Sequence, residues 1–159
     1  MATTVGLEVS YGQLAVFASS LKQPFNDWTD QHVSQGFAWR PGSVSFRTMV
    51  EAGRHSIEID VANHVGAIHA DVVRVIEVPF ESPADGAVEV GSIAETVPLS
   101  LPPGSFLLRC EFLQPAGGAG ERVRLTFAKK DAPRFAVVRA DPELSASGEL
   151  LTTAQPAPG

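Results

Sequence analysis

The sequence predicts an all-β fold: an antiparallel two-sheet β-sandwich with one short helix at about residues 28–35. Several segments alternate apolar and polar residues with period two, and clusters of Gly, Pro and Asp separate most of them. Such alternation places successive side chains on opposite faces of a sheet, which is typical of strands with one wet face. Around nine short strands with almost no helix indicate two packed sheets.

Four segments show the alternation most clearly, and their apolar residues are expected to face one core. These residues are Val5, Leu7 and Val9; Ile57, Ile59 and Val61; Phe106, Leu108, Cys110 and Phe112; and Val123, Leu125 and Phe127. Six further strands are predicted from β-branched and aromatic residues between turn signals. They cover residues 13–18, 43–49, 71–78, 87–90, 97–101 and 135–139.

A strong turn signal lies at residues 101–106, where the sequence reads LPPGSF. Proline sets φ for the second position of a turn, and Gly104 accepts a positive φ at the third. We therefore expect this turn to join two antiparallel strands. The stretch QPAGGAG at 114–120 is expected to be a flexible hairpin loop, because a strand follows it and the phosphate-binding Gly-Lys-Ser/Thr does not.

The one predicted helix lies in the stretch DWTDQHVSQG, at residues 27–36. Asp27 is expected to cap its first turn, and Asp30 suits the positive end of the helix dipole. Gly36 can end the helix in the left-handed conformation. His32 is expected to be an ordinary surface residue of this helix.

Length and composition predict a single domain over residues 1–140, followed by a mobile C-terminal tail at 141–159. The chain has 159 residues, of which 44% are hydrophobic, and this suits one core. The tail lacks aromatic residues and ends in Pro, Ala and Gly, a composition typical of disordered segments.

The expected compartment is the cytoplasm, and no membrane contact is predicted. The sequence has no run of about 18 apolar residues, and its first residues, MATTVGLEVS, have neither a basic start nor an apolar signal segment. Cys110 is the single cysteine, so no internal disulfide can form, as expected in a reducing compartment. Because Cys110 shares its predicted face with Phe106 and Phe112, we expect a buried, inert thiol.

The net charge of −6 is unevenly distributed along the chain. Residues 56–111 hold nine acidic and two basic residues, whereas residues 112–140 hold six basic and two acidic ones. Binding to phosphates needs a basic surface, so this balance disfavours direct nucleic-acid binding and favours a protein partner with a basic face. A solvated acidic surface that only aids solubility would explain the same charge.

Residues 11–46, YGQLAVFASSLKQPFNDWTDQHVSQGFAWRPGSVSF, place an unusual Asp-Trp-Thr-Asp turn between two strand-like segments. This stretch resembles the competence protein ComJ family. In that family an aromatic residue opens a strand, a connector ends in Asp-Trp-Thr-Asp, a short helix is closed by Gly and an aromatic residue, and a Ser-Phe strand follows. The matching positions are Tyr11, Phe17, Asp27, Trp28, Thr29, Asp30, Gly36, Phe37, Ser45 and Phe46. LPPGSFLLRC resembles a second recurring stretch, which extends the resemblance from about residue 5 to about residue 139.

The resemblance implies a non-catalytic inhibitor that forms a complex with a cation-dependent, sequence-nonspecific DNA nuclease associated with DNA uptake. An immunity-type protein that inhibits a nuclease toxin would bind its target through the same kinds of contact. We expect acidic side chains and aromatic rings to cover the basic DNA site of the partner, with carboxylates standing where phosphates would lie. The predicted partner-binding residues are Asp27, Trp28, Asp30, Trp39, Arg40, Glu58, Asp60, Glu81 and Asp85.

Structural roles remain open for several of these residues. Trp28 could close one end of the sandwich instead of contacting a partner, and helix capping alone would explain Asp27 and Asp30. Trp39 has no favoured role, because Arg40 and a proline follow it at a predicted loop.

Other functions have less support in the sequence. His64, His69 and Asp71 are suitable metal donors, but on one continuous strand residues 64 and 69 point to opposite faces, so no metal or other cofactor is predicted. No Gly-x-Ser-x-Gly, His-Glu-x-x-His or Walker motif is present, and we expect no enzyme activity. The main alternative is a stand-alone β-sandwich module that binds carbohydrate, lipid headgroup or calcium.

Overall fold

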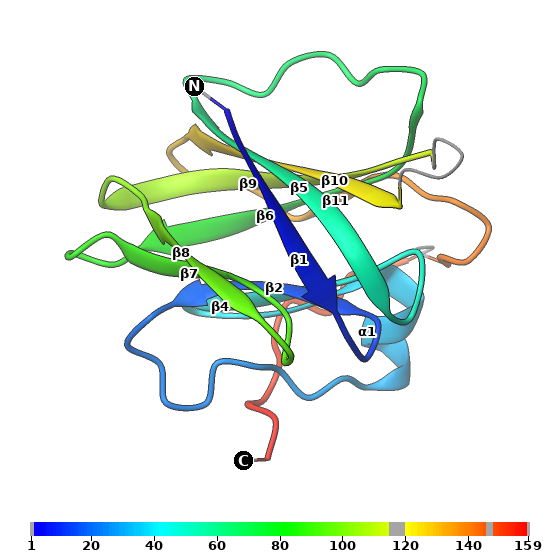
Figure 1. Ribbon diagram of the computed structural model, residues 1–159, viewed down its shortest axis with the longest axis horizontal. Helices are drawn as coiled ribbons and strands as arrows, with labels where there is room; N and C mark the ends of the chain where they lie inside the picture. The colour runs from blue at the N-terminus through cyan, green and yellow to red at the C-terminus, as the bar shows by residue number, and fades with distance from the viewer. Residues whose placement is uncertain (1, 115–119, 146–147, 159) are drawn as a thin grey trace.

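The computed structural model describes residues 2–114, 120–145 and 148–158, and it has two β-sheets packed face to face (Figure 1). Eleven strands and one helix, α1 (Asp30–Gln35), lie within these residues. The predicted sandwich with one short helix is confirmed. The strands are β1 (Thr3–Val9), β2 (Gln13–Ala18), β3 (Phe37–Arg40), β4 (Ser43–Arg47), β5 (Gly53–Ala62), β6 (Val72–Ser82), β7 (Ala87–Gly91), β8 (Thr96–Ser100), β9 (Gly104–Leu113), β10 (Glu121–Lys129) and β11 (Ala136–Arg139).

One sheet has six strands in the order β1-β5-β10-β9-β6-β11, and the other has five in the order β3-β4-β2-β7-β8. Strands β5 and β10 run parallel, with Val123 opposite Ile57, whereas the other neighbouring strands are antiparallel. The prediction of purely antiparallel sheets is therefore wrong for one pair. Alternation indicates which face of a sheet a side chain takes, but it does not indicate which strand lies beside it.

The apolar residues of the alternating segments meet between the sheets, as predicted. Leu7, Ile57, Leu108 and Phe127 are buried in one cluster with residues of the five-stranded sheet. Cys110 also lies in this cluster, and burial raises the pKa of its thiol well above the ordinary value. The thiol is therefore protonated and unreactive at neutral pH.

Two local connections differ from the predictions. Phe37–Arg40 forms β3, an edge strand of four residues that is too short for alternation to reveal. The LPPGSF turn links β8 in one sheet to β9 in the other, so it is a crossover between sheets and not the predicted hairpin. Leu101 holds this crossover in place, because its N–H donates to Gly86 O at 2.9 Å and its carbonyl accepts from Ser82 Oγ at 3.1 Å. Most of the predicted 114–120 loop lies outside the described residues.

The helix begins two residues later than predicted, and Thr29 caps it instead of Asp27. The Thr29 hydroxyl accepts from the His32 backbone N–H at 3.4 Å, and His32 Nδ1 accepts from the Thr29 N–H at 2.9 Å. This reciprocal pair satisfies two N–H groups that a helix terminus leaves free. Gly36 ends the helix with a φ of 93°, as predicted.

The described part of the C-terminal segment packs against the domain, which differs from the mobile tail that the sequence predicts. Leu144 is buried beside Gly36. The Gln35 amide donates to Leu151 O at 2.8 Å, and its oxygen accepts from Leu151 N at 2.9 Å. His32 Nε2 donates to Thr153 O at 2.9 Å, so this histidine is buried and is not the surface residue expected.

An ion pair fixes the start of this segment. Asp141 accepts hydrogen bonds from Arg74 Nε at 2.6 Å and Arg74 Nη2 at 3.1 Å, and the two side chains are 7% and 0% exposed. Arg74 Nη1 also donates to Arg47 O at 2.6 Å, and the guanidinium lies 5.5 Å from the centre of the Phe112 ring. Such a buried charge needs these partners, because an unpaired charge in a protein interior is very unfavourable.

Candidate protein-docking surface

The acidic stretch of the sequence does not form a continuous anionic face in the fold. Glu58 is ion-paired with Arg124 at 2.7 Å, and Arg124 also lies 3.8 Å from Glu111. A second pair joins Glu77 to Arg109 at 2.7 Å. The hydrogen bond to Glu58 raises the pKa of Arg124, against the opposing effect of burial. Arginines from neighbouring strands of the six-stranded sheet therefore neutralise several of its carboxylates.

The structure does not bring together all of the acidic residues predicted to contact a partner. Glu58 and Asp60 lie on β5, among the paired charges of the six-stranded sheet. Glu81 and Asp85 are exposed, but the strand register places Glu81 at the end of the sheet opposite to Gly53. The predicted acidic surface is thus divided between separate regions of the molecule.

Trp39 and Arg40 make contacts within the protein. Trp39 Nε1 donates to Pro79 O at 2.7 Å, and the indole packs edge-on against Phe135 with ring centres 5.0 Å apart. Arg40 Nε donates to Asn26 Oδ1 at 2.7 Å. These contacts join β3 to β6 and to the connector before α1, so both side chains stabilise the fold.

The remaining predicted residues, Asp27, Trp28 and Asp30, lie together where the connector enters α1. Trp28 is half-buried, and its Nε1 donates to Gln13 Oε1 at 3.2 Å, which holds the indole against the start of β2. Asp27 and Asp30 lie on either side of it in the chain, and both are exposed. This cluster borders a pocket.

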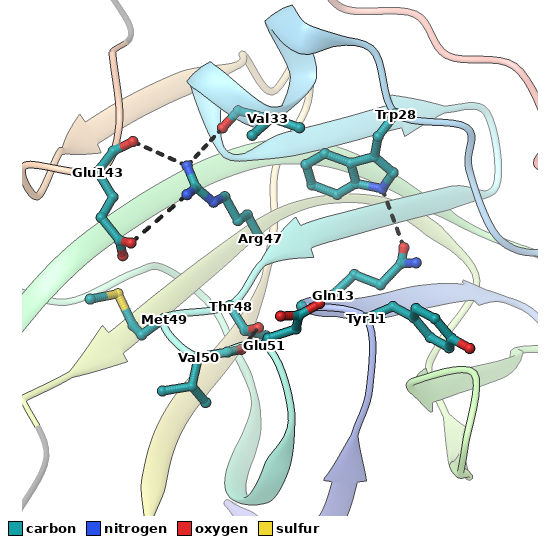
Figure 2. A pocket seen from close by; sticks show the side chains of 11 residues that line it. Tyr11, Gln13, Trp28, Val33, Arg47, Thr48, Met49, Val50, Glu51 and Glu143 are labelled. Atoms are coloured by element: carbon teal, nitrogen blue, oxygen red, sulfur yellow. Dashed lines mark hydrogen bonds and ion pairs between the residues drawn. The ribbon is translucent and has the colours of Figure 1, made fainter.

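The pocket beside Trp28 is open to solvent and has a volume of about 480 Å³ (Figure 2). We call it the Tyr11 pocket. It lies between the β1–β2 turn, α1, the β4–β5 loop and the C-terminal segment. This volume is in the range of protein sites that bind small molecules or side chains. Residues that line it include Tyr11, Trp28, Val33, Arg47, Met49 and Glu51.

Tyr11 lies in the β1–β2 turn with a φ of 56°, a left-handed conformation that costs a non-glycine residue about 1–2 kcal/mol. The residue is 73% exposed, so burial does not offset this cost. Gly12 N donates to Glu51 O at 2.6 Å, and Thr48 N donates to Gly12 O at 2.9 Å. These bonds tie the backbone of the turn to the β4–β5 loop, and the turn presents an aromatic ring to solvent.

Several exposed apolar side chains lie at the end of the sandwich that holds the Tyr11 pocket. Four large ones are exposed in the described part of the chain: Tyr11, Val33, Ile93 and Val138. The first two line the Tyr11 pocket. Ile93 lies in the β7–β8 turn, which is joined to the β1–β2 turn by a hydrogen bond from Ser10 N to Ser92 Oγ at 2.9 Å. Contiguous exposed apolar residues mark sites of interaction with other molecules.

The charged groups of the pocket differ in how they are paired. Arg47 lies 3.8 Å from the Glu143 carboxylate, and it donates to Val33 O at 3.2 Å (Figure 2). No ion pair or hydrogen bond reaches the Glu51 carboxylate from residues 2–114, 120–145 or 148–158. Glu51 therefore provides a negative charge that no group of the described residues neutralises.

His64, His69 and Asp71 lie in the segment between β5 and β6, and across the described ranges no three His, Cys, Asp or Glu side chains are grouped so that they could hold a metal ion. In the same part of the chain, no helix has the length and apolar character needed to cross a membrane.

Sequence reasoning identified Trp28 but missed Tyr11, Val33 and Glu51 as candidate contact residues. Tyr followed by Gly between two strands was an available signal, because a bulky residue in a tight turn has little protein around it to pack against. Val33 and Glu51 have no comparable signal, since they reach the pocket from a helix and a loop that are distant in sequence.

Residues 6–128 match the model of the family Competence protein J (ComJ). A protein of Bacillus subtilis (strain 168) named DNA-entry nuclease inhibitor is 28% identical over 109 residues, which cover 65% of this chain and 76% of that protein. A crystal structure from Bacillus subtilis, described as ComJ, inhibitor of the DNA degrading activity of NucA, has a TM-score of 0.66 at 20% identity. That similarity covers 80% of this chain and 96% of the other, and it supports the two-sheet fold.

Proposed function

This chain belongs to the Competence protein J (ComJ) family, and on that premise we propose that it binds a DNA nuclease and inhibits its DNA-degrading activity. The observation that carries the proposal is the family match over residues 6–128, which includes strands of both sheets from β1 to β10. The chain acts by forming a complex and not as an enzyme. We expect the partner to require a cation and to cleave DNA of any sequence.

Charge supplies the long-range attraction between the two proteins. A DNA nuclease needs a basic surface to neutralise phosphates, whereas this chain has a net charge of −6. Several carboxylates of the six-stranded sheet are paired with arginines, so exposed acids elsewhere, such as Asp27, Asp30 and Glu51, are better placed to meet the partner. A bound inhibitor would cover the DNA site and exclude the substrate.

A DNA-cleavage assay tests this proposal. Purified protein is mixed with NucA of Bacillus subtilis and with the homologous nuclease from the organism that carries this chain, and plasmid cleavage is followed. We expect stoichiometric inhibition at low salt that weakens as the salt concentration rises, because the Debye length falls from about 10 Å at 0.1 M to about 3 Å at 1 M. An unrelated acidic protein of similar net charge is the control. Undiminished cleavage by both nucleases at every salt concentration would reject the proposed function.

A further inference from the structure

We propose that the Tyr11 pocket receives a lysine or arginine side chain from the DNA-binding surface of the nuclease. This inference rests on the proposed function and names the place where the partner is held. At one end of the sandwich, the Tyr11 pocket combines the Trp28 ring, an exposed tyrosine at its margin, aliphatic surface and a carboxylate that has no ion pair within the described residues.

The walls of the pocket suit a long cationic side chain with an apolar stem. Trp28 contributes an aromatic ring, and Val33 and Met49 contribute aliphatic surface (Figure 2). Tyr11 lies at the margin of the pocket, and its exposed ring points away from the other labelled side chains (Figure 2). Lysine and arginine pack their methylene groups along such surface while the charged group stays near polar atoms. A cation is also attracted to the face of a Trp or Tyr ring.

The charge of the pocket favours a cation over other side chains. Glu51 has no ionic partner within the described residues, and the guanidinium of Arg47 is occupied by Glu143 and Val33 O. Asp27 and Asp30 add negative charge beside Trp28. An acidic partner side chain would be repelled, and a neutral one would leave a carboxylate desolvated without a counterion.

The pocket is organised before any partner arrives. Tyr11 is held in its left-handed conformation by the backbone bonds between Gly12, Thr48 and Glu51. A site that loses little conformational entropy on binding has a higher affinity than a mobile site with the same buried area. Backbone strain at an exposed aromatic residue is also typical of positions that bind a ligand or a partner.

Replacing Tyr11 by Asn separates binding from stability. Asn tolerates positive φ, and the tyrosine ring makes little packing contact, so Tyr11→Asn is expected to keep or raise Tm. Calorimetric titration with the nuclease that the unaltered chain inhibits should show a Kd at least about tenfold higher, because an exposed aromatic contact beside the pocket is lost. Val138→Ser is the matched control, since Val138 is an exposed apolar residue on β11, and its Kd should change less than about twofold.

Replacing Glu51 by Gln tests the charge alone. Glu51→Gln keeps the size of the side chain, and it should raise Kd by about three- to tenfold at low salt while making the dependence of Kd on salt shallower. Asp131→Asn is the control, because Asp131 is an exposed acid in the loop after β10, at the other end of the sandwich. It should leave Kd within about twofold.

The outcomes separate this inference from the proposed function. If the unaltered chain binds neither nuclease, both are overturned. If it binds tightly and both Tyr11→Asn and Glu51→Gln bind as tightly, the inference alone is overturned. A loss of binding in Glu81→Gln instead of Glu51→Gln would place the contact at the opposite end of the molecule, and it would also overturn the inference alone.

Discussion

Replacing Asp141 by alanine is expected to lower the free energy of unfolding by about 3–5 kcal/mol. The change removes both hydrogen bonds that the Asp141 carboxylate accepts from Arg74, whose side chain is completely buried. Arg74 would keep its hydrogen bond to Arg47 O, but its charge would lose the nearest counterion. Urea unfolding followed by tryptophan fluorescence measures the loss as a lower midpoint at an unchanged slope.

Two companion variants show whether burial of the charge is the cause. Glu143 lies 3.5 Å from Arg74 but is half exposed, so Glu143→Ala should cost less than about 1 kcal/mol. Adding Arg74→Met to Asp141→Ala should recover most of the loss, because an apolar side chain needs no counterion. Equal losses for Asp141→Ala and Glu143→Ala, or no recovery in the double variant, would contradict the explanation.

The same ion pair predicts a loss of stability in acid. Burial alone would raise the pKa of Asp141, but the hydrogen bond and the charge of Arg74 outweigh it and leave the pKa below the ordinary value of 3.8. The stabilisation is therefore fully present above pH 3.8 and is lost as the pH falls through the lower native value. Asp141→Ala should lack this component, which a comparison of Tm between pH 7 and pH 2 for both proteins would reveal.

Replacing Gly91 by alanine is expected to lower the free energy of unfolding by about 1–3 kcal/mol. A Cβ atom at this position would lie 2.2 Å from Glu95 O and 2.5 Å from Thr96 Cα, both of which belong to the backbone of the β7–β8 hairpin. Backbone atoms cannot rotate away, so the hairpin must open. Thermal unfolding followed by circular dichroism measures the effect as a lower Tm.

Gly66→Ala is the control for this change. Apart from the two residues adjacent to it in the chain, no atom of the described residues lies within 4 Å of the position that a Cβ on Gly66 would take, and the residue has no positive φ. Alanine there should be neutral or stabilising by up to about 1 kcal/mol, because it restricts the unfolded chain. If both variants lose the same stability, the close approach at Gly91 is not the cause.

Alternation predicted well which side chains face the core, but it did not predict which strands pair with each other. Phe106, Leu108, Cys110 and Phe112 are all buried on one face of β9, because a period of two is a property of the strand itself. The parallel position of β10 beside β5 depends on segments that are distant in sequence. No local pattern encodes such a pairing.

The C-terminal segment shows the limits of composition as a guide. It lacks aromatic residues, yet Asp141 meets a buried arginine and Leu144 enters the core cluster. The partners, Arg74 and the residues around Gly36, lie far earlier in the chain. A segment of low hydrophobicity can therefore be ordered by a few specific contacts that its own composition does not indicate.

The candidate site was predictable only in part, for a similar reason. Trp28, Asp27 and Asp30 could be found because they are adjacent in an unusual motif. The pairing of Glu58 with Arg124 could not be found, since the two residues come from strands that meet only in the folded sheet. Counting charges along the chain therefore overestimated the acidity of that face.

The place of β10 between β5 and β9 affects how the protein is made. β1 pairs with β5, and the other edge of β5 pairs with β10, which the ribosome synthesises about sixty residues later at roughly 5–20 residues per second. Until then β1 and β5 form at most an isolated ribbon of two strands, which is marginally stable in water. The larger sheet is consequently completed only after most of the chain has emerged, and its unpaired edge at β5 is open to aggregation during translation.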